Sequence, residues 1–197
     1  MNSTKSLSVE VFVVFALLMA TIWLPGYWIL GLIALSIIFA SWRLRHDSLR
    51  QLGLLPNDFS QTKALTKFVL VSLAILVALG MMITPGFWKI PDFWLNIFRQ
   101  FQKYIAWAFV QQLLLHGYFT SRLATIFEVR HRGTRAALVS ASFVGIMFAI
   151  LHLPNPVLTV TTLLVTPVGA YLFLKSRNIY LLTLTHAILG TAIKYLV

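Results

Sequence analysis

The polar side chains that could do chemistry lie inside long apolar stretches of this sequence. Gln111, Gln112 and His116 lie in one stretch, and His152 and His186 lie in two others. An amide or imidazole group in hydrocarbon costs free energy unless it finds a hydrogen-bond partner. We therefore expect the three stretches to turn these groups toward one another and to form one buried site.

The spacing of these residues supports this expectation. Three pairs are each four residues apart: Gln112 with His116, Phe148 with His152, and His186 with Gly190. Residues at this spacing lie on the same face of an α-helix. Each of the three helices would then present one narrow polar face to a common centre.

Carboxylates are expected outside this site. The five acidic residues all fall at the ends of apolar segments or in loops: Glu10, Asp47, Asp58, Asp92 and Glu128. A hydrolase usually needs a general base to activate water or a nucleophile. Inside the apolar segments, that part falls to His116, His152 or His186.

The composition indicates a membrane protein. Hydrophobic residues make up 59% of the chain and charged residues only 11%, whereas soluble domains carry about 25% charged residues. The absence of cysteine excludes disulfides and thiolate metal sites. The net charge of +11 is typical of basic residues that flank membrane spans and meet anionic lipid, so we expect the lipid bilayer as a partner and no nucleic acid.

The apolar segments predict an all-α, polytopic transmembrane helical bundle that forms one domain over residues 1–197. A span needs about 20 mostly apolar residues. About seven segments qualify: 8–24, 28–42, 64–84, 104–127, 136–153, 157–174 and 179–197. The aromatic stretch 87–103 is predicted to be an interfacial helix at the membrane surface, and the alternative is a loop followed by an early start of the fourth span.

Charge predicts the orientation of these spans. With a cytoplasmic N-terminus, all but four of the 16 basic residues fall on the cytoplasmic side, the exceptions being Lys89, Arg99, Lys103 and Lys194. Cytoplasmic loops of membrane proteins carry such an excess of Lys and Arg. We therefore predict a multi-pass protein of the bacterial inner (cytoplasmic) membrane with its N-terminus in the cytoplasm, and we expect the first apolar segment to be a retained span.

The motifs Gln-Gln-Leu-Leu-Leu-His, Phe-x-x-x-His and His-x-x-x-Gly, in this order, resemble the CPBP family of CAAX-processing and bacteriocin-protection intramembrane proteases. The family pattern is Glu-Glu-x-x-x-Arg, Phe-x-x-x-His and His-x-x-x-Asn. The order and spacing match over residues 111–190. Residues 104–197 are therefore expected to form a CPBP-like core.

The resemblance also implies roles for the site residues. The two family glutamates fall on Gln111 and Gln112, the arginine on His116, and the asparagine on Gly190, whereas the Phe and both histidines are kept as Phe148, His152 and His186. In the family, the first glutamate and the middle histidine are thought to activate water, and the last histidine and the asparagine to stabilise the oxyanion. The resemblance thus implies that Gln111 positions water, that His152 acts as base, and that His186 supports the oxyanion.

The changed residues predict altered chemistry. A glutamine side chain cannot take a proton near neutral pH, although it can still orient a water molecule. Gly190 lacks the amide donor of the family asparagine, and Asn155 is a candidate to supply one. Phe148, Asn155 and Gly190 are the candidate substrate-binding residues.

Several functions remain open at this point. The first is an intramembrane endopeptidase with altered or impaired chemistry, acting on a membrane-associated peptide or protein. The alternatives are a non-catalytic pseudoprotease that binds a membrane peptide or lipid-linked partner, and a small transporter. We expect no cofactor; the alternative is zinc held by His116, His152 and His186 with a water molecule. The glutamines could also serve only as hydrogen-bonding links between helices.

Overall fold

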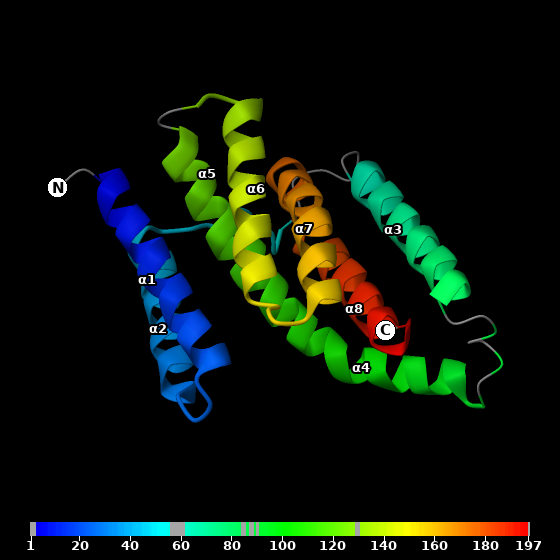
Figure 1. Cartoon of the computed structure of the whole chain (residues 1–197). Helices are drawn as coiled ribbons and strands as arrows, with labels where there is room; N and C mark the ends of the chain where they lie inside the picture. Colours follow the sequence, from blue (N-terminus) through cyan, green and yellow to red (C-terminus); the bar gives the residue numbers. More distant parts are fainter. Residues whose placement is uncertain are drawn as a thin grey trace.

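The chain folds into helices, as its composition predicts. The computed structural model describes residues 3–55, 62–83, 86, 89, 91–128 and 131–196 (Figure 1), and these residues contain no strand. Its elements are α1 (Ser3–Trp23), α2 (Trp28–Leu44), α3 (Thr62–Ile83), α4 (Phe93–Gln112), the π-helix η2 (Leu113–Thr120), α5 (Ser121–Glu128), α6 (Thr134–Ile150), α7 (Pro156–Ser176) and α8 (Ile179–Leu196). The all-α prediction is confirmed for this part of the chain. Asp58 and residues 87, 88 and 90 of the predicted interfacial helix lie outside it.

Two helices among the described residues are long and apolar enough to cross a membrane. They are residues 4–23 and 156–176, with mean hydropathies of 2.1 and 1.9. Three shorter apolar helices cover residues 28–44, 134–150 and 179–193. The count of about seven spans therefore stays a prediction, as does their orientation.

The segment predicted as an interfacial helix followed by a fourth span is one continuous helix. α4 begins at Phe93 and passes directly into η2 and α5, so the predicted boundary at residue 104 is wrong. The basic residues Arg99 and Lys103 within it both lie on the exposed face of α4. In Figure 1, α4 lies at a large angle to α5, and the change of direction falls within this continuous segment.

The π-helix η2 lies at the centre of this segment, and side-chain hydroxyls support its wide turns. Thr120 Oγ1 donates to the Leu115 carbonyl at 3.0 Å, and Ser121 Oγ donates to the His116 carbonyl at 3.2 Å. Both acceptors lie five residues back, which matches the spacing of a π-helix. Most of η2 is buried, so its side chains lie between the helices that pack around it.

A close approach between α6 and α7 fixes the position of the end of α6. A Cβ atom at Gly145 would lie 2.5 Å from Cγ of Pro167, so only glycine fits there. α7 continues through Pro167 from Pro156 to Ser176. The contact places the C-terminal turn of α6, which carries Phe148, directly beside α7.

The loop after α2 packs inward against the helices. Leu52 and Gly53 are buried. Gly53 has a φ of +80°, and a Cβ there would lie 2.6 Å from Cε2 of Phe173. Arg177 donates to the Gln51 carbonyl at 3.0 Å. The loop therefore ties α2 to the turn between α7 and α8.

Glu10 lies deeper than the sequence suggested. Because α1 begins at Ser3, Glu10 is two turns inside the helix rather than at its end. Its carboxylate accepts hydrogen bonds from Ser41 Oγ at 2.6 Å, Arg45 Nη2 at 3.0 Å and Tyr118 Oη at 2.9 Å. These contacts join α1 to α2 and η2.

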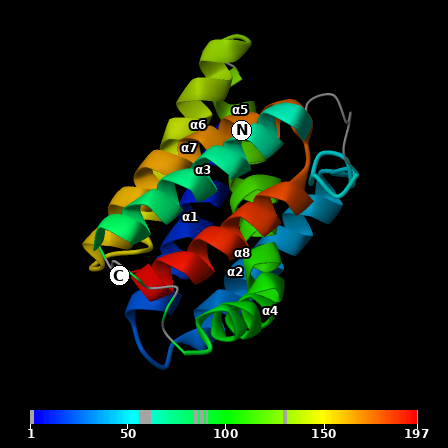
Figure 2. The same ribbon diagram turned by 90° about the vertical axis from the view of Figure 1, so that its right-hand side faces the viewer.

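Arg122 extends this group of contacts. Its guanidinium donates to both carboxylate oxygens of Asp47 and, at 3.0 Å, to Ser41 Oγ. We call Glu10, Arg45, Asp47 and Arg122 the charged cluster. It holds the α1–α2 hairpin on α5. Figure 1 shows this hairpin on one side of the molecule and α3 on the other, and Figure 2 views the α3 side.

Candidate functional site

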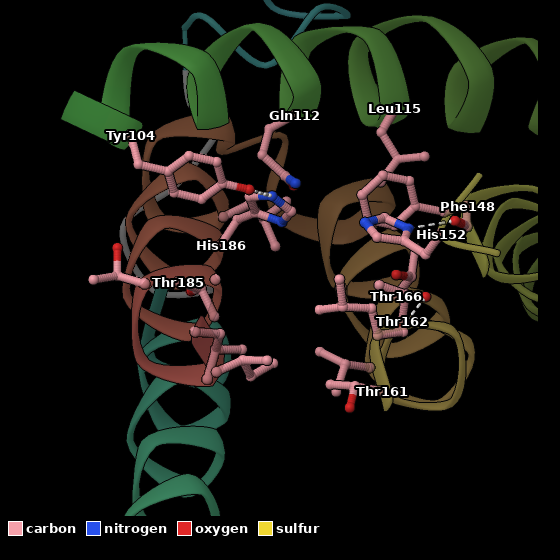
Figure 3. A pocket seen from close by; sticks show the side chains of 18 of the residues that line it. Tyr104, Gln112, Leu115, Phe148, His152, Thr161, Thr162, Thr166, Thr185 and His186 are labelled. Atoms are coloured by element: carbon pink, nitrogen blue, oxygen red, sulfur yellow. Dashed lines mark hydrogen bonds between the residues drawn. The ribbon is translucent and has the colours of Figure 1, made fainter. Parts of the chain in front are cut away.

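Six elements, α3, α4, η2, α6, α7 and α8, contribute to the lining of a cavity of about 490 Å³, with further residues from the α6–α7 turn (Figure 3). The structure places all but one of the predicted site residues on its wall: Gln112, His116, Phe148, His152, Asn155, His186 and Gly190. Gln111 is the exception. Their positions do not test the catalytic and substrate-binding roles that the sequence implied, and these roles stay predictions.

His152 lies in the turn after α6, because α6 ends at Ile150 rather than at residue 153 as predicted. Its Nδ1 is 2.7 Å from the carbonyl oxygen of Phe148. The last carbonyls of a helix have no partner within the helix, and a nearby histidine can satisfy one of them. A carbonyl oxygen only accepts, so Nδ1 carries the proton and donates it, and Nε2 of the neutral imidazole keeps a free lone pair.

His186 forms a compact group with Tyr104 and Gln111. Its Nε2 is 2.8 Å from Tyr104 Oη and 3.0 Å from Gln111 Oε1, and Tyr104 Oη donates to the same Oε1 at 3.1 Å. The amide oxygen only accepts, so Nε2 of His186 carries its proton. This hydrogen then points toward the two oxygens, and Nδ1 is the unprotonated nitrogen of the neutral ring.

Sequence reasoning missed Tyr104. It lies seven residues before Gln111, which is two helical turns away on the same face. We placed it at the start of a span, where a tyrosine is typical of the membrane interface. Its spacing from Gln111 was the signal that could have identified it.

The two adjacent glutamines have different surroundings. Gln112 is 3% exposed and lies on the cavity wall, and Figure 3 shows its carboxamide directed into the cavity. Gln111 faces His186 and Tyr104 instead. Gln112 is thus the glutamine that lines the cavity, and the water-positioning role that the resemblance implies for Gln111 stays a prediction.

The ring of Phe148 lies near both histidines of the family pattern, His152 and His186. Its ring centroid is 4.5 Å from that of His152 and 5.8 Å from that of His186. The phenyl ring itself is buried. The two imidazoles are therefore separated by little more than one aromatic ring.

His116 belongs to the cavity wall at its most buried point. It is 2% exposed, and its ring stacks on Phe173 with centroids 5.4 Å apart. Its Nδ1 is 3.1 Å from Thr120 Oγ1, whose hydroxyl already donates to the Leu115 carbonyl. Nδ1 of His116 is therefore the donor in this contact, and the imidazole is held in a fixed orientation.

The three histidines do not form a metal-ligand group. In the part of the chain with described coordinates, no three His, Cys, Asp or Glu side chains are placed together to hold a metal ion. One nitrogen of each ring is engaged in the hydrogen bonds given above. The zinc alternative therefore depends on the sequence alone, and the expectation that no cofactor is needed stays a prediction.

Asn155 has a structural partner. Its Oδ1 accepts a hydrogen bond from the backbone N–H of Leu158 at 3.0 Å and so caps the N-terminus of α7, with Pro156 as the first helical residue. Both features are typical of helix starts. The amide oxygen is thus engaged in the cap, whereas the amide nitrogen is available to a ligand.

Neutral groups make up the polar part of the cavity wall. Among the residues with described side chains, the lining contains imidazoles, amides and threonine hydroxyls but no Asp, Glu, Lys or Arg. Chemically, this wall offers a basic nitrogen on His152 and an amide on Gln112. The rest is largely apolar and suits a hydrophobic ligand segment.

The fold is thus a group of apolar helices around a cavity whose largely apolar wall carries a few neutral polar groups. The sequence model of one protein family, type II CAAX prenyl endopeptidase Rce1-like, matches residues 93–192, which is half of the chain. The chain belongs to this family. The match confirms the membership expected from the motifs between Gln111 and Gly190. Comparison with curated proteins and with solved structures gives no match.

Proposed function

We propose that this protein is a membrane-embedded endopeptidase of altered chemistry that binds a membrane-associated peptide or protein segment in the cavity. Family membership supports this class of function. The observation that carries the proposal is the state of His152: its Nδ1 donates to a backbone carbonyl, which leaves Nε2 as a base on the cavity wall. The ring of His186 lies near the same Phe148 ring, with centroids 5.8 Å apart.

The proposed reaction needs few groups. Nε2 of His152 takes a proton from a water molecule held by the Gln112 amide, and the resulting hydroxide adds to the carbonyl carbon of a peptide bond. The Nε2–H of His186, which points toward Tyr104 Oη and Gln111 Oε1 in the free site, turns to the tetrahedral oxyanion and stabilises it with a hydrogen bond. When the C–N bond breaks, His152 returns the proton to the leaving amine, so the histidine is unchanged at the end.

We expect this chemistry to be slow. A well-placed general base contributes about 10² to 10⁴ in rate, and in this site glutamines stand where the family has glutamates. An imidazole without a carboxylate partner retains only part of that contribution. The protein would then turn over slowly while binding its substrate normally.

A non-catalytic binding protein is the second candidate. The observation that favours it is the lack of any carboxylate among the described lining residues. In that case the cavity would hold a membrane peptide or a lipid-linked partner without cleaving it. The described residues give no separate support to the transporter alternative, which stays a prediction.

The two candidates can be separated with purified protein in lipid nanodiscs. The probe is a quenched fluorescent peptide that carries a prenylated C-terminal cysteine motif, with the unprenylated peptide as a second arm. We expect slow cleavage by the native protein, a loss of about 100-fold or more in His152→Gln, and no change in His131→Gln. His131 lies in the loop before α6, away from the cavity lining.

Each outcome decides between the candidates. Equal cleavage by His152→Gln and the native protein would show that His152 is not the base. Binding of the peptide without cleavage would favour the non-catalytic candidate. Cleavage that a chelator abolishes and added zinc restores would support the three-histidine zinc site instead.

A further inference from the structure

Tyr104 on α4 and Gly190 on α8 are complementary in shape. A Cβ atom at residue 190 would lie 2.7 Å from Cε1 of Tyr104 and 3.2 Å from its hydroxyl oxygen. Real Cβ atoms essentially never make contacts shorter than 3.0 Å. Any side chain at residue 190 would therefore displace the phenol ring from its present place.

The phenol ring is also fixed against His186. The two rings stack with centroids 5.7 Å apart and an interplanar angle of 29°. The hydroxyl lies 2.8 Å from Nε2 of His186 and 3.1 Å from Oε1 of Gln111. Ring stacking and the hydroxyl contact of Tyr104 thus both act on His186, and the contact to Oε1 holds the phenol beside Gln111.

We propose that Tyr104 is a positioning residue of this site, and that Gly190 makes the space for it. The phenol hydroxyl holds Nε2–H of His186 toward Gln111 and thereby fixes both the orientation and the tautomer of the imidazole at the cavity wall. The effect on turnover depends on the proposed endopeptidase function. The effect on His186 itself does not depend on it.

The first test reads His186 directly and needs no activity. Protein with ¹⁵N-labelled histidine rings is studied by NMR in nanodiscs as the native chain, Tyr104→Phe, Gly190→Ala and Tyr180→Phe. Tyr180 is the control, because its hydroxyl, like that of Tyr104, donates a hydrogen bond, here at 3.1 Å to the Leu54 carbonyl and away from the cavity. We expect the ring nitrogens of His186 to shift in Tyr104→Phe and Gly190→Ala but not in Tyr180→Phe, and those of His152 to stay constant.

A second test measures the coupling between the two positions. Gly190→Ala should lower the Tm in the native background because the added methyl group meets the phenol ring. In a Tyr104→Ala background the same change should have no such effect, because the ring is gone. An equal Tm shift in both backgrounds would overturn the proposed complementarity, as would unchanged His186 resonances in Tyr104→Phe.

The third test links the pair to turnover. Removing one neutral hydrogen bond in Tyr104→Phe should lower kcat for the prenylated peptide by about tenfold and leave KM within twofold, while Tyr180→Phe keeps the native kcat. A change in KM alone would contradict a positioning role. If the native protein does not cleave the peptide at all, the proposed function fails, and the NMR and Tm results still decide the role of Tyr104.

Discussion

The charged cluster and the cavity wall are two polar groups of this protein that contain opposite kinds of side chain. The charged cluster joins two carboxylates, Glu10 and Asp47, to two guanidiniums, Arg45 and Arg122. The cavity wall holds imidazoles and amides, and no charged residue is among its described lining. Both regions contain side chains of the segment that runs from α4 through η2 to α5.

The difference follows from the cost of burying charge. A charge taken out of water needs a partner of opposite sign and good hydrogen bonds, or it destabilises the fold by several kcal/mol. The cluster meets this condition, because its formal charges cancel. A charged group on a cavity wall does not meet this condition fully, since one side of it faces the cavity and not a partner of opposite charge. Neutral groups tolerate that situation at a smaller cost.

The charged cluster and the cavity wall therefore have different roles, the first in stability and the second in the proposed chemistry. Glu10 and Asp47 hold helices together, and the described polar side chains that line the cavity are neutral. Tyr118 and His116, two residues apart in η2, illustrate this: the Tyr118 hydroxyl donates to Glu10, and His116 lies on the cavity wall. One short π-helix therefore connects the two regions.

The largest expected effect comes from breaking the charged cluster with Arg122→Leu. Arg122 is 6% exposed and makes the contacts to Asp47 and Ser41. Its removal leaves the Asp47 carboxylate, whose side chain is 10% exposed, without its cation, and we expect the free energy of unfolding to fall by about 3 to 5 kcal/mol. Thermal unfolding followed by tryptophan fluorescence in nanodiscs measures this.

The control for Arg122→Leu is Arg135→Ala, since Arg135 is exposed at the start of α6 and its loss should change stability by less than about 0.5 kcal/mol. Cleavage per folded molecule should be unchanged in both variants. Similar small effects of the two changes would show that the cluster does not hold the α1–α2 hairpin in place.

The second prediction places a charge in the neutral region. Gln112→Glu restores a carboxylate at a residue that lines the cavity, and we expect cleavage of the reporter peptide to rise by about 10²-fold. Stability should fall, because the new charge has no cation among the described lining residues. Initial rates and thermal unfolding of the same samples measure both effects.

Gln111→Glu is the comparison for this variant. Gln111 faces Tyr104 and His186 rather than the cavity, so its conversion should give a smaller gain. A larger gain from Gln111→Glu would show that the water-activating position is the one implied by the family resemblance. No gain from either variant would favour the non-catalytic candidate.

Local spacing predicted much of the candidate site. The i, i+4 pairs placed Gln112 and His116 on one face, and the structure has both on the cavity wall. This prediction succeeded because polar groups within apolar helices need hydrogen-bond partners and so turn toward other polar groups. It worked even though η2 is a π-helix, which no residue pattern in that stretch had indicated.

Contacts between residues that are far apart in the chain could not be predicted from the sequence. The depth of Glu10 depends on the start of α1 and on Ser41 and Tyr118, which are far away in the chain. The place of Tyr104 depends on an absent side chain at Gly190. Hydropathy and residue spacing describe the side chains that are present, so they could not reveal a contact that depends on the absence of a Cβ atom at Gly190.

The smallest expected effect concerns Asn155, at the edge of the cavity. Its Oδ1 caps α7 through the N–H of Leu158, and removing such a cap costs about 1 kcal/mol. We expect Asn155→Ala to lower the free energy of unfolding by this amount. Asn155→Asp should keep the stability of the native protein, because a carboxylate oxygen caps a helix equally well.

The aspartate variant also separates the two roles of Asn155. It retains the acceptor that the cap needs and loses the amide N–H₂ that a substrate carbonyl would use. If Asn155 is only a cap, Asn155→Asp binds and cleaves the reporter peptide like the native protein. A raised KM at native stability would instead assign the amide nitrogen to substrate binding. Because Asn155 is exposed at the edge of the cavity, whereas Gln112 is 3% exposed, the added charge is not buried within the protein as that of Gln112→Glu is.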